Sequence, residues 1–407
     1  MRTAATRMMS ACVALVLVAC ASATASPSPA TFPSSAASPS VEASEAPSQS
    51  VPVATSTPRV ELTPSPSATA QPASPRGPTL TVNGKSPVWA PDSAHFATSA
   101  GGENIYDAGG TLVRQCEFSS PRWLDATHLV GLGVDQIPPF RGFICDIEDG
   151  TTTTIDLPES PEYALANGHG AVALAWPTGG DWRNPYYDFV VWGDGASTKP
   201  QEGSPELWSE AGSELVVTHQ AARNGSGGGA TIASWPGLDQ LYVSPRGWDA
   251  SGSLFDPSGR YVSIEAFDDD LRQNVSHLVD LSTGHAIDLP GNRDNMEWWT
   301  ADERLSVAVG GRLTDVFSTD GTLIASTMSP GSIGVASADG STVAYADLDT
   351  TTGMWQPTVE VVRNSQATAF RLPAVGLGST FAVSPDGQAI VVSGADLDSV
   401  SYLLTDY

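Results

Sequence analysis

Positive charge is scarce in this sequence. Its 407 residues include 19 Lys and Arg against 45 Asp and Glu, which gives a formal net charge of −26 at pH 7. A surface that binds nucleic acid or an anionic membrane needs clustered cations, and this chain has few of them after its first residues. We therefore expect no nucleic-acid partner, whereas cationic partners or calcium would suit the excess of carboxylates.

Helical periodicity and catalytic signatures are lacking as well. No stretch of useful length carries apolar residues at helical spacing, and the apolar run near the start, Ala11 to Ala19, is too short to cross a bilayer. There is no Gly-x-Ser-x-Gly elbow and no His-Glu-x-x-His motif, and the six His residues are scattered. The sequence thus gives no sign of an α/β serine hydrolase or a zinc peptidase.

The amino terminus has the layout of an export signal. Arg2 and Arg7 precede the short apolar run, which ends in Leu17-Val18-Ala19-Cys20. These four residues resemble the lipobox of bacterial lipoproteins, in which the signal is cut before the cysteine and the cysteine is acylated. The resemblance implies that residues 1–19 are a signal peptide and that Cys20 anchors the chain, through lipid, to the extracytoplasmic face of the cell membrane. The alternative is an ordinary signal with a chance cysteine.

Residues 20–77 have the composition of a disordered linker. They are almost wholly Ser, Pro, Ala and Thr, as in SPSPATFPSSAASPS, and contain too little apolar surface to offset the entropy of ordering. Because Pro is so frequent, the linker should be partly extended and hold the following domain away from the membrane.

The remaining residues, 78–407, repeat one hairpin. The clearest copy is FAVSPDGQAIVVSG, Phe381 to Gly394, in which a Pro-Asp-Gly turn joins two apolar strands. Copies spaced by about 34 to 48 residues, the period of a four-stranded propeller blade, start at Trp89, Trp123, Leu165, Trp208, Phe255, Trp299, Ala336 and Val383.

These repeats predict an all-β fold, a β-propeller of about eight four-stranded blades, with seven as the alternative. The last unit ends at Tyr407 after three strands, so the segment Leu80 to Gly84 is expected to supply the fourth and close the ring. The phrase Val383 to Gly387 resembles the repeat of TolB-type, WD-like propellers. The pattern departs from that family at Leu165 to Gly168 and Trp208 to Gly212, where Pro-Asp is lost and the blade count is least secure.

Aromatic residues fall into two sets. Those that head many copies are expected to pack between neighbouring sheets. A second set is predicted to lie in longer, wetter loops. Packing against the adjacent blade is the favoured interpretation of these residues, and the lining of a carbohydrate or peptide site is the alternative. This set comprises Trp182, Tyr186, Tyr187 and Trp248.

Two cysteines remain outside the amino-terminal region. Cys116 and Cys145 fall on strands of the first and second predicted blades. An exported protein meets an oxidising compartment, so we expect these two residues to form a disulfide. Two separate buried thiols are the alternative.

Acidic clusters follow the second strand of three hairpins and would lie on one face of the disc. Gathered carboxylates bind calcium, although none of these runs has the ligand spacing of a known calcium loop, and solvated turns are the alternative. We expect no other cofactor. The clustered residues are Asp268, Asp269, Asp270, Asp347, Asp349, Asp396 and Asp398.

Two functions are compatible with these features. The first is a monomeric, lipid-anchored propeller without catalytic activity, which binds or scaffolds protein, peptide or glycan partners at the cell envelope. The second is a propeller enzyme, a hydrolase or lyase acting on sugars or lactones at the mouth of the central channel, since the fold alone does not decide function. The first interpretation is favoured because no catalytic constellation is seen in the sequence.

Overall fold

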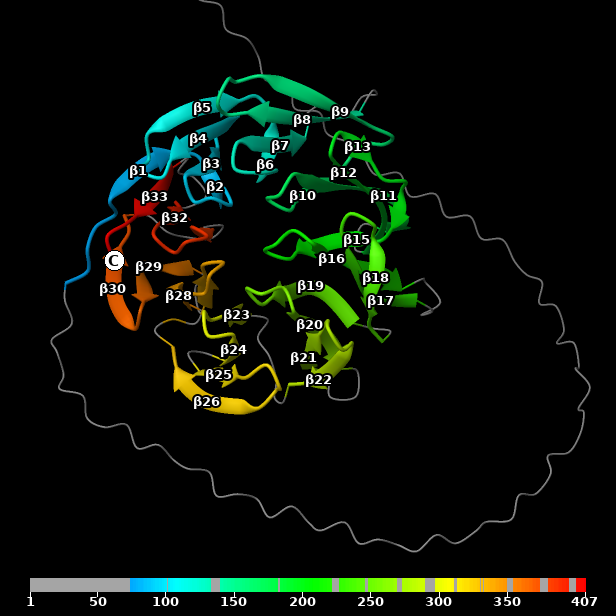
Figure 1. The fold of residues 1–407 in the computed structure, drawn as a ribbon. Helices are drawn as coiled ribbons and strands as arrows, with labels where there is room; N and C mark the ends of the chain where they lie inside the picture. The colour runs from blue at the N-terminus through cyan, green and yellow to red at the C-terminus, as the bar shows by residue number, and fades with distance from the viewer. Residues whose placement is uncertain are drawn as a thin grey trace, which may run out of the picture. The chain divides into compact units, whose positions relative to one another are not determined.

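The computed structural model describes residues 74–100, 102–132, 140–181, 184–221, 227–245, 248–268, 273–289, 297–310, 313–329, 331, 333–349, 354–373, 380–394 and 400–407. In these ranges the chain forms 33 strands and no helix. The strands make eight antiparallel sheets that stand around a common centre (Figure 1). The fold is therefore an eight-bladed β-propeller, as the repeats predicted. The predicted signal peptide and most of the predicted linker lie outside the described residues.

The blades follow one another along the chain. Blade 1 consists of β2 (Lys85–Trp89), β3 (His95–Ser99), β4 (Glu103–Asp107) and β5 (Leu112–Cys116). Blade 2 consists of β6 (Ser119–Trp123), β7 (His128–Leu132), β8 (Phe140–Asp146) and β9 (Thr152–Leu157). Blade 3 consists of β10 (Tyr163–Ala166), β11 (Ala171–Asp181), β12 (Asn184–Gly193) and the short strands β13 (Ala196–Ser197) and β14 (Gln201–Glu202). Blade 4 consists of β15 (Ser204–Trp208), β16 (Glu214–Ala221), β17 (Gly227–Ser234) and β18 (Asp239–Val243).

The second half of the ring repeats this plan. Blade 5 consists of β19 (Trp248–Phe255), β20 (Tyr261–Asp268), β21 (Gln273–Asp280) and β22 (His285–Asp288). Blade 6 consists of β23 (Glu297–Trp299), β24 (Leu305–Gly310), β25 (Leu313–Phe317) and β26 (Leu323–Met328). Blade 7 consists of β27 (Ile333–Ala336), β28 (Thr342–Asp349), β29 (Met354–Arg363) and β30 (Gln366–Arg371). Blade 8 consists of β31 (Phe381–Val383), β32 (Ile390–Ser393), β33 (Val400–Leu404) and β1 (Leu80–Asn83).

The two ends of the domain meet in blade 8. Strand β1 pairs with β33, with Leu80 opposite Leu403 and Asn83 opposite Val400. The first strands of successive blades contact one another in turn, and β31 of blade 8 contacts β2 of blade 1. The predicted closure of the ring is thereby confirmed, and it removes the free edges that the first and last segments would otherwise expose.

Side chains in the first turn of each blade explain why the hairpin tolerates sequence change. In blade 8, the hydroxyl of Ser384 donates to Asp386 at 2.7 Å and accepts from the backbone N–H of Ala389 at 2.9 Å. In blade 3, where Pro-Asp is lost, Oδ1 of Asn167 accepts from the N–H groups of His169 and Ala171 at 2.8 and 2.9 Å. A short polar side chain that binds its own turn is enough to fix the loop.

The first turn of blade 4 is also fixed by side chains, although Pro-Asp is lost there. There the hydroxyl of Ser209 donates to the carboxylate of Glu214 at 2.5 Å and accepts from the N–H of Glu214 at 3.1 Å. Blades 3 and 4, where the blade count was least secure, therefore keep the hairpin without the family sequence.

Hydrophobic clusters fill the seams between neighbouring blades. Seven clusters are found among the described residues, and each combines side chains of two adjacent sheets. At the seam of blades 8 and 1, for example, Phe96 packs with Val391 and Leu403, all at most 1 % exposed. Burial of apolar area between sheets, at about 25 cal/mol per Å², is the main force that holds the ring together.

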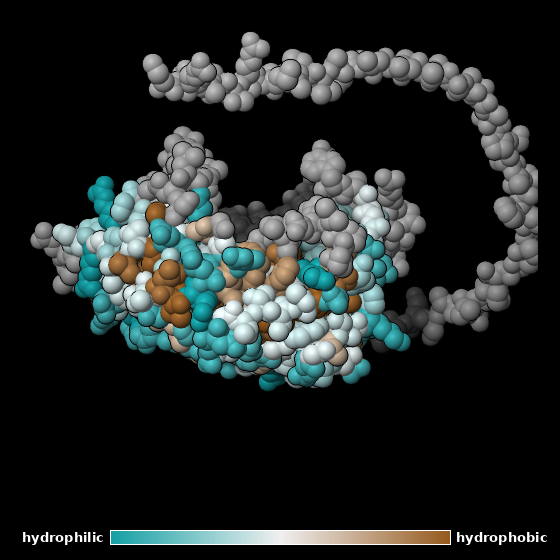
Figure 2. Space-filling view, turned by 90° about the horizontal axis from the view of Figure 1, so that it is seen from above, coloured by the Kyte–Doolittle hydropathy of each residue, from teal (hydrophilic) through white to brown (hydrophobic). Residues whose placement is uncertain are grey.

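The side of the ring seen in Figure 2 is mainly hydrophilic, with separate apolar patches. Within the described ranges, no helix is long and apolar enough to span a membrane. With the exception of Leu313, the exposed large apolar side chains lie on outermost strands. They are Leu80, Leu112, Val113, Leu241, Val243, Leu313, Leu323, Ile324 and Met328.

Candidate binding site at the centre of the ring

Tryptophans that end the first strands fasten neighbouring blades to one another. Each indole Nε1–H donates to a backbone carbonyl in the first strand of the preceding blade. The acceptor is the residue just before the one that corresponds to the tryptophan in that strand. The four bonds run from Trp89 to Ala382 (3.0 Å), Trp123 to Val88 (3.0 Å), Trp208 to Leu165 (2.9 Å) and Trp299 to Leu254 (3.4 Å). The aromatic residues that head the repeats are thus packed between sheets, as expected, and also make directed bonds across the seams.

A first cavity of about 390 Å³ lies inside the ring of first strands. Its walls come from blades 1, 2, 3, 4, 7 and 8, and include Val88, Trp123, Leu165 and Ala382. Residues of the first turns, such as Pro91, also contribute, so the cavity lies towards the face that carries these turns, here called the turn face.

A second cavity, of about 330 Å³, is formed by the first strands and first turns of blades 4 to 7. The two cavities share Leu207, Trp208, Glu210 and Ala338, and they therefore adjoin. Together they form what we call the central recess. A concave, mainly apolar site with a few polar groups is the usual form of a ligand-binding pocket.

Glu210 is the ionisable group common to both halves of the recess. It lies in the first turn of blade 4 and its side chain reaches solvent, yet the surrounding walls desolvate the carboxyl group, and this burial raises the pKa of Glu210 above its usual value. The nearby His169 acts in the opposite direction on that pKa. Nε2 of His169 lies 2.8 Å from the backbone oxygen of Glu210. A positively charged neighbour would therefore stabilise the ionised form of this carboxyl group in the recess.

A second charged pair lies behind the wall of the recess. Arg122 lines the first cavity, and Glu103 of blade 1 faces it across the seam with blade 2. Glu103 is only 1 % exposed and accepts from the hydroxyl of Ser99 at 2.8 Å. Burial raises the pKa of Glu103 to about 6, against the opposing effects of Ser99 and Arg122. Burial also lowers the pKa of the Arg122 guanidinium, against the opposing charge of Glu103. Desolvation of both groups therefore outweighs their attraction.

Of the four predicted aromatic ligand residues, the structure describes the side chains of Tyr186 and Tyr187 alone. Trp182 lies outside the described residues, and of Trp248 only the strand position is described. The ring of Tyr187 packs edge-on against Tyr163 at 5.5 Å, and its hydroxyl donates to Glu162 at 3.0 Å. Tyr186 and Tyr187 border a cavity of only about 20 Å³, which is too small for a sugar or a peptide. For Tyr187, packing against a neighbour describes the structure better than a ligand-binding role.

The predicted calcium clusters fall largely outside the described part of the chain. Asp269, Asp270, Asp396 and Asp398 lie outside it. Asp268, Asp347 and Asp349 are placed only as residues of β20 and β28. Among the side chains that are described, no group of three or more His, Cys, Asp or Glu could hold a metal ion. The calcium site remains a prediction, as does the lipid site at Cys20, which also lies outside the described residues.

Blades 1 and 2 are joined covalently. Cys116 of β5 and Cys145 of β8 form a disulfide, with 6.4 Å between their Cα atoms. The pairing expected from the sequence is therefore present. Both cysteines are at most 3 % exposed, so the bond is shielded inside the seam.

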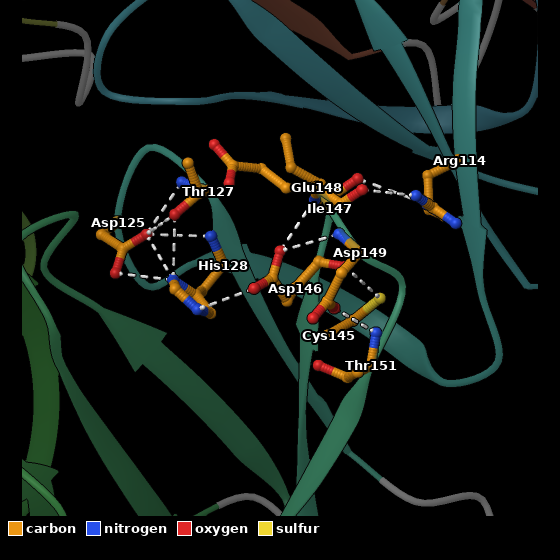
Figure 3. A network of polar contacts seen from close by, with 10 residues as sticks. All are labelled: Arg114, Asp125, Thr127, His128, Cys145, Asp146, Ile147, Glu148, Asp149 and Thr151. Carbon is orange, nitrogen blue, oxygen red and sulfur yellow. Dashed lines mark hydrogen bonds and ion pairs between the residues drawn. The ribbon is translucent and has the colours of Figure 1, made fainter.

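A polar network continues this connection across the turn face (Figure 3). Nδ1 of His128 lies 2.9 Å from Asp125, and its Nε2 lies 3.6 Å from Asp146, so the ring bridges the two turns of blade 2. Arg114 of blade 1 donates to the backbone oxygens of Ile147 and Glu148 at 3.3 and 2.8 Å. This network supports the seam of blades 1 and 2 and lies apart from the residues that line the recess.

Sequence reasoning missed the central recess and Glu210. Glu210 follows Trp208 in a first turn, at a place where the family phrase has Pro-Asp, but nothing at that position marks it as a residue of the recess. The tryptophans were identified as core residues, but the direction of their N–H groups was not predicted.

Comparisons with known proteins support the architecture. No family model matches the sequence, and no curated protein matches it either. Among solved structures, the chain is similar to BamB from Moraxella catarrhalis, at 12% identity over 80% of this chain and 100% of that chain, with a TM-score of 0.51. It is also similar to a chain of a mitotic checkpoint complex (11% identity, 87% and 100% covered, TM-score 0.48) and to TolB from Acinetobacter baumannii (13%, 69% and 80%, 0.37). At this identity the likeness to BamB shows the propeller fold alone.

Proposed function

We propose that this chain is a binding module, anchored by lipid on Cys20 to the outer side of a bacterial cell membrane, which takes a segment of a partner protein into the central recess. The observation that carries the proposal is the pair of adjoining cavities, of about 390 and 330 Å³, at the centre of the turn face. Their combined size suits an extended peptide or a loop and not a folded domain.

The chemistry of the walls favours a peptide over a glycan. Pro87, Val88, Leu165 and Trp123 give the first cavity a mainly apolar lining, and the indole N–H of Trp123 is already engaged with a backbone carbonyl. A sugar presents many hydroxyl groups that need hydrogen-bonding partners when they are buried, whereas apolar side chains of a peptide do not. No observation on the described residues favours the alternative, an enzyme that cleaves sugars or lactones.

Site-directed cross-linking tests the proposal in cells. A photo-reactive phenylalanine analogue is introduced in place of Ala338, which lines both cavities, and, as a matched control, in place of exposed Thr153 on the outermost strand of blade 2. We expect a discrete protein adduct from position 338 that is absent at position 153. Adducts of the same kind at both positions, or none at position 338, would contradict the proposal.

Membrane attachment is tested separately. Replacement Cys20→Ser removes the only thiol that the lipobox resemblance assigns to acylation, so we expect the protein to move from the membrane fraction to the soluble fraction of cell extracts. The control is Cys116→Ser, which should leave fractionation unchanged because that thiol belongs to the disulfide. Retention of Cys20→Ser on the membrane would contradict lipid anchoring.

A further inference from the structure

The described lining of the second cavity, between the first strands of blades 4 to 7, combines aromatic residues with acidic residues. Its described lining includes the aromatic residues Trp208, Phe255 and Trp299, each at most 9 % exposed, together with the acidic residues Glu210 and Glu297, of which Glu297 is buried. None of the described residues that line it is a Lys, Arg or His. A carboxylate beside apolar surface attracts an organic cation that carries a methylene stem, because the charge binds the carboxylate and the stem packs on the apolar surface.

The polar groups of the rings are already engaged. The indole N–H groups of Trp208 and Trp299 donate to Leu165 and Leu254. These two tryptophans, which are 6 % and 4 % exposed, therefore contribute a narrow apolar surface to the cavity and no free donor for an anion. Their bonds also hold the rings in place, so a cation that enters finds a preformed wall.

Glu210 differs from the other carboxyl groups of this cavity. Asp256 is fully buried, and its carboxylate accepts from the N–H of Tyr261 at 2.6 Å and from the hydroxyl of Ser258 at 2.5 Å, so it belongs to its own turn. Glu297 is buried and accepts from Ser276. Glu210 is exposed at the edge of the cavity, where an incoming group reaches it first.

We propose that this cavity receives a Lys or Arg side chain of the partner protein, with the cationic head at Glu210 and the methylene stem along Trp208 and Trp299. A volume of about 330 Å³ accommodates one such side chain. The net charge of −26 would attract a basic segment over distances up to about a Debye length. The proposal rests on the proposed function, because it names the chemistry of the segment that enters the recess.

Two short peptides test this inference on the full chain carrying Cys20→Ser, which has no lipid. One is a blocked pentapeptide with a central lysine, and the other carries norleucine in place of lysine, which keeps the apolar stem and removes the charge. The indole N–H NMR signals of Trp208 and Trp299, assigned with Trp208→Phe and Trp299→Phe, report binding at the site. We expect the lysine peptide to shift these signals and the norleucine peptide to bind at least about tenfold more weakly.

Glu210→Gln and Glu148→Gln provide the matched variants. Both lie in turns of the same face, but Glu148 lies outside the lining of the recess. Glu210→Gln should weaken binding of the lysine peptide about tenfold, and Glu148→Gln should leave it unchanged. Equal thermal unfolding of the two variants shows that Glu210→Gln has not simply damaged the fold.

The outcomes separate this inference from the proposed function. Equal binding of the two peptides, or unchanged binding to Glu210→Gln, would overturn the cation site and leave a recess that binds peptides through apolar contacts. Absence of any shift at about 10 mM lysine peptide would also overturn it. The cross-linking experiment at position 338 would then decide independently whether a partner enters the recess.

Discussion

The seams between blades 1 and 2 and between blades 5 and 6 are built alike near the centre and differently at the rim. In both, a tryptophan at the end of a first strand donates to the preceding blade, Trp123 to Val88 at 3.0 Å and Trp299 to Leu254 at 3.4 Å. Further out, the seam of blades 1 and 2 is closed by the disulfide, whereas residues of blades 5 and 6 border an open groove of about 450 Å³. The inner contact is thus common to both seams, and the outer contact differs between them.

Among the changes that probe these two seams, removal of the disulfide should lower the unfolding free energy the most. Cys116→Ala combined with Cys145→Ala opens a loop with a sequence separation of 29 residues. Without the disulfide, the unfolded chain gains the conformational entropy that the closed loop restricted. This gain lowers the unfolding free energy by about 3.5 kcal/mol. Urea unfolding followed by tryptophan fluorescence measures the loss.

A reductant provides the control for that measurement. It should destabilise the wild-type protein by a similar amount and leave the double variant unaffected. Equal stability of the wild-type protein and the double variant would show that the non-covalent contacts of this seam are sufficient.

The charged pair of Glu103 and Arg122, in the seam of blades 1 and 2, should have the next largest effect on the unfolding free energy. This effect depends on pH. Burial raises the pKa of Glu103 from 4.5 to about 6 in the folded protein. A carboxyl group whose pKa is raised on folding favours the folded state when it is protonated, so its contribution is present below about pH 4.5 and is lost as the pH rises through 6. The full change is about 2 kcal/mol.

Comparison with Glu103→Gln isolates this contribution from those of the other carboxyl groups. The unfolding free energy of the wild-type protein minus that of the variant should fall by about 2 kcal/mol between pH 4 and pH 7. A difference that stays constant over this range, or rises, would show that Arg122 compensates the Glu103 carboxylate fully.

The tryptophan bonds allow the two seams to be compared directly. Trp123→Phe removes a donor at 3.0 Å, whereas Trp299→Phe removes one at 3.4 Å. We expect a loss of about 1 to 2 kcal/mol for Trp123→Phe and a smaller loss for Trp299→Phe, because the longer bond is weaker and the volume change is the same. Thermal unfolding of both variants tests the order, and a larger loss for Trp299→Phe would reverse the comparison.

Local turn chemistry explains why the fold could be predicted from the sequence. Each first turn needs one short polar side chain that binds its own backbone, and Ser384, Ser209 and Asn167 all meet that need. The hairpins could therefore be located even where the family phrase had changed, and the closing strand followed from the one strand that the last unit lacked. These features depend on residues near one another in the sequence.

The central recess could not be predicted in the same way. It exists because eight first strands meet around one axis, so its walls join residues as distant as Val88 and Ala382. No local pattern marks Glu210 as the carboxylate that both cavities share. The packing of Tyr187 on Tyr163 likewise depends on how neighbouring strands pair, so the sequence left a packing role and a ligand-binding role both open.

The smallest effect is expected at the open groove of blades 5 and 6. Arg260 donates to Asp280 at 2.8 Å, and this bond, followed by that from Ser282, holds the pKa of Asp280 well below its usual value. The stability from a lowered carboxyl pKa is present above the ordinary value near 3.8 and is lost only as the pH falls below it. Because the Arg260 side chain is 51% exposed and the pair is screened by salt, Arg260→Ala should lower the unfolding free energy at pH 7 only slightly, and less than any of the variants above. Chemical unfolding at low and high salt measures it, and a loss comparable to that of the disulfide would mean that this pair within blade 5 stabilises the wall of the groove as strongly as a covalent bond stabilises the other seam.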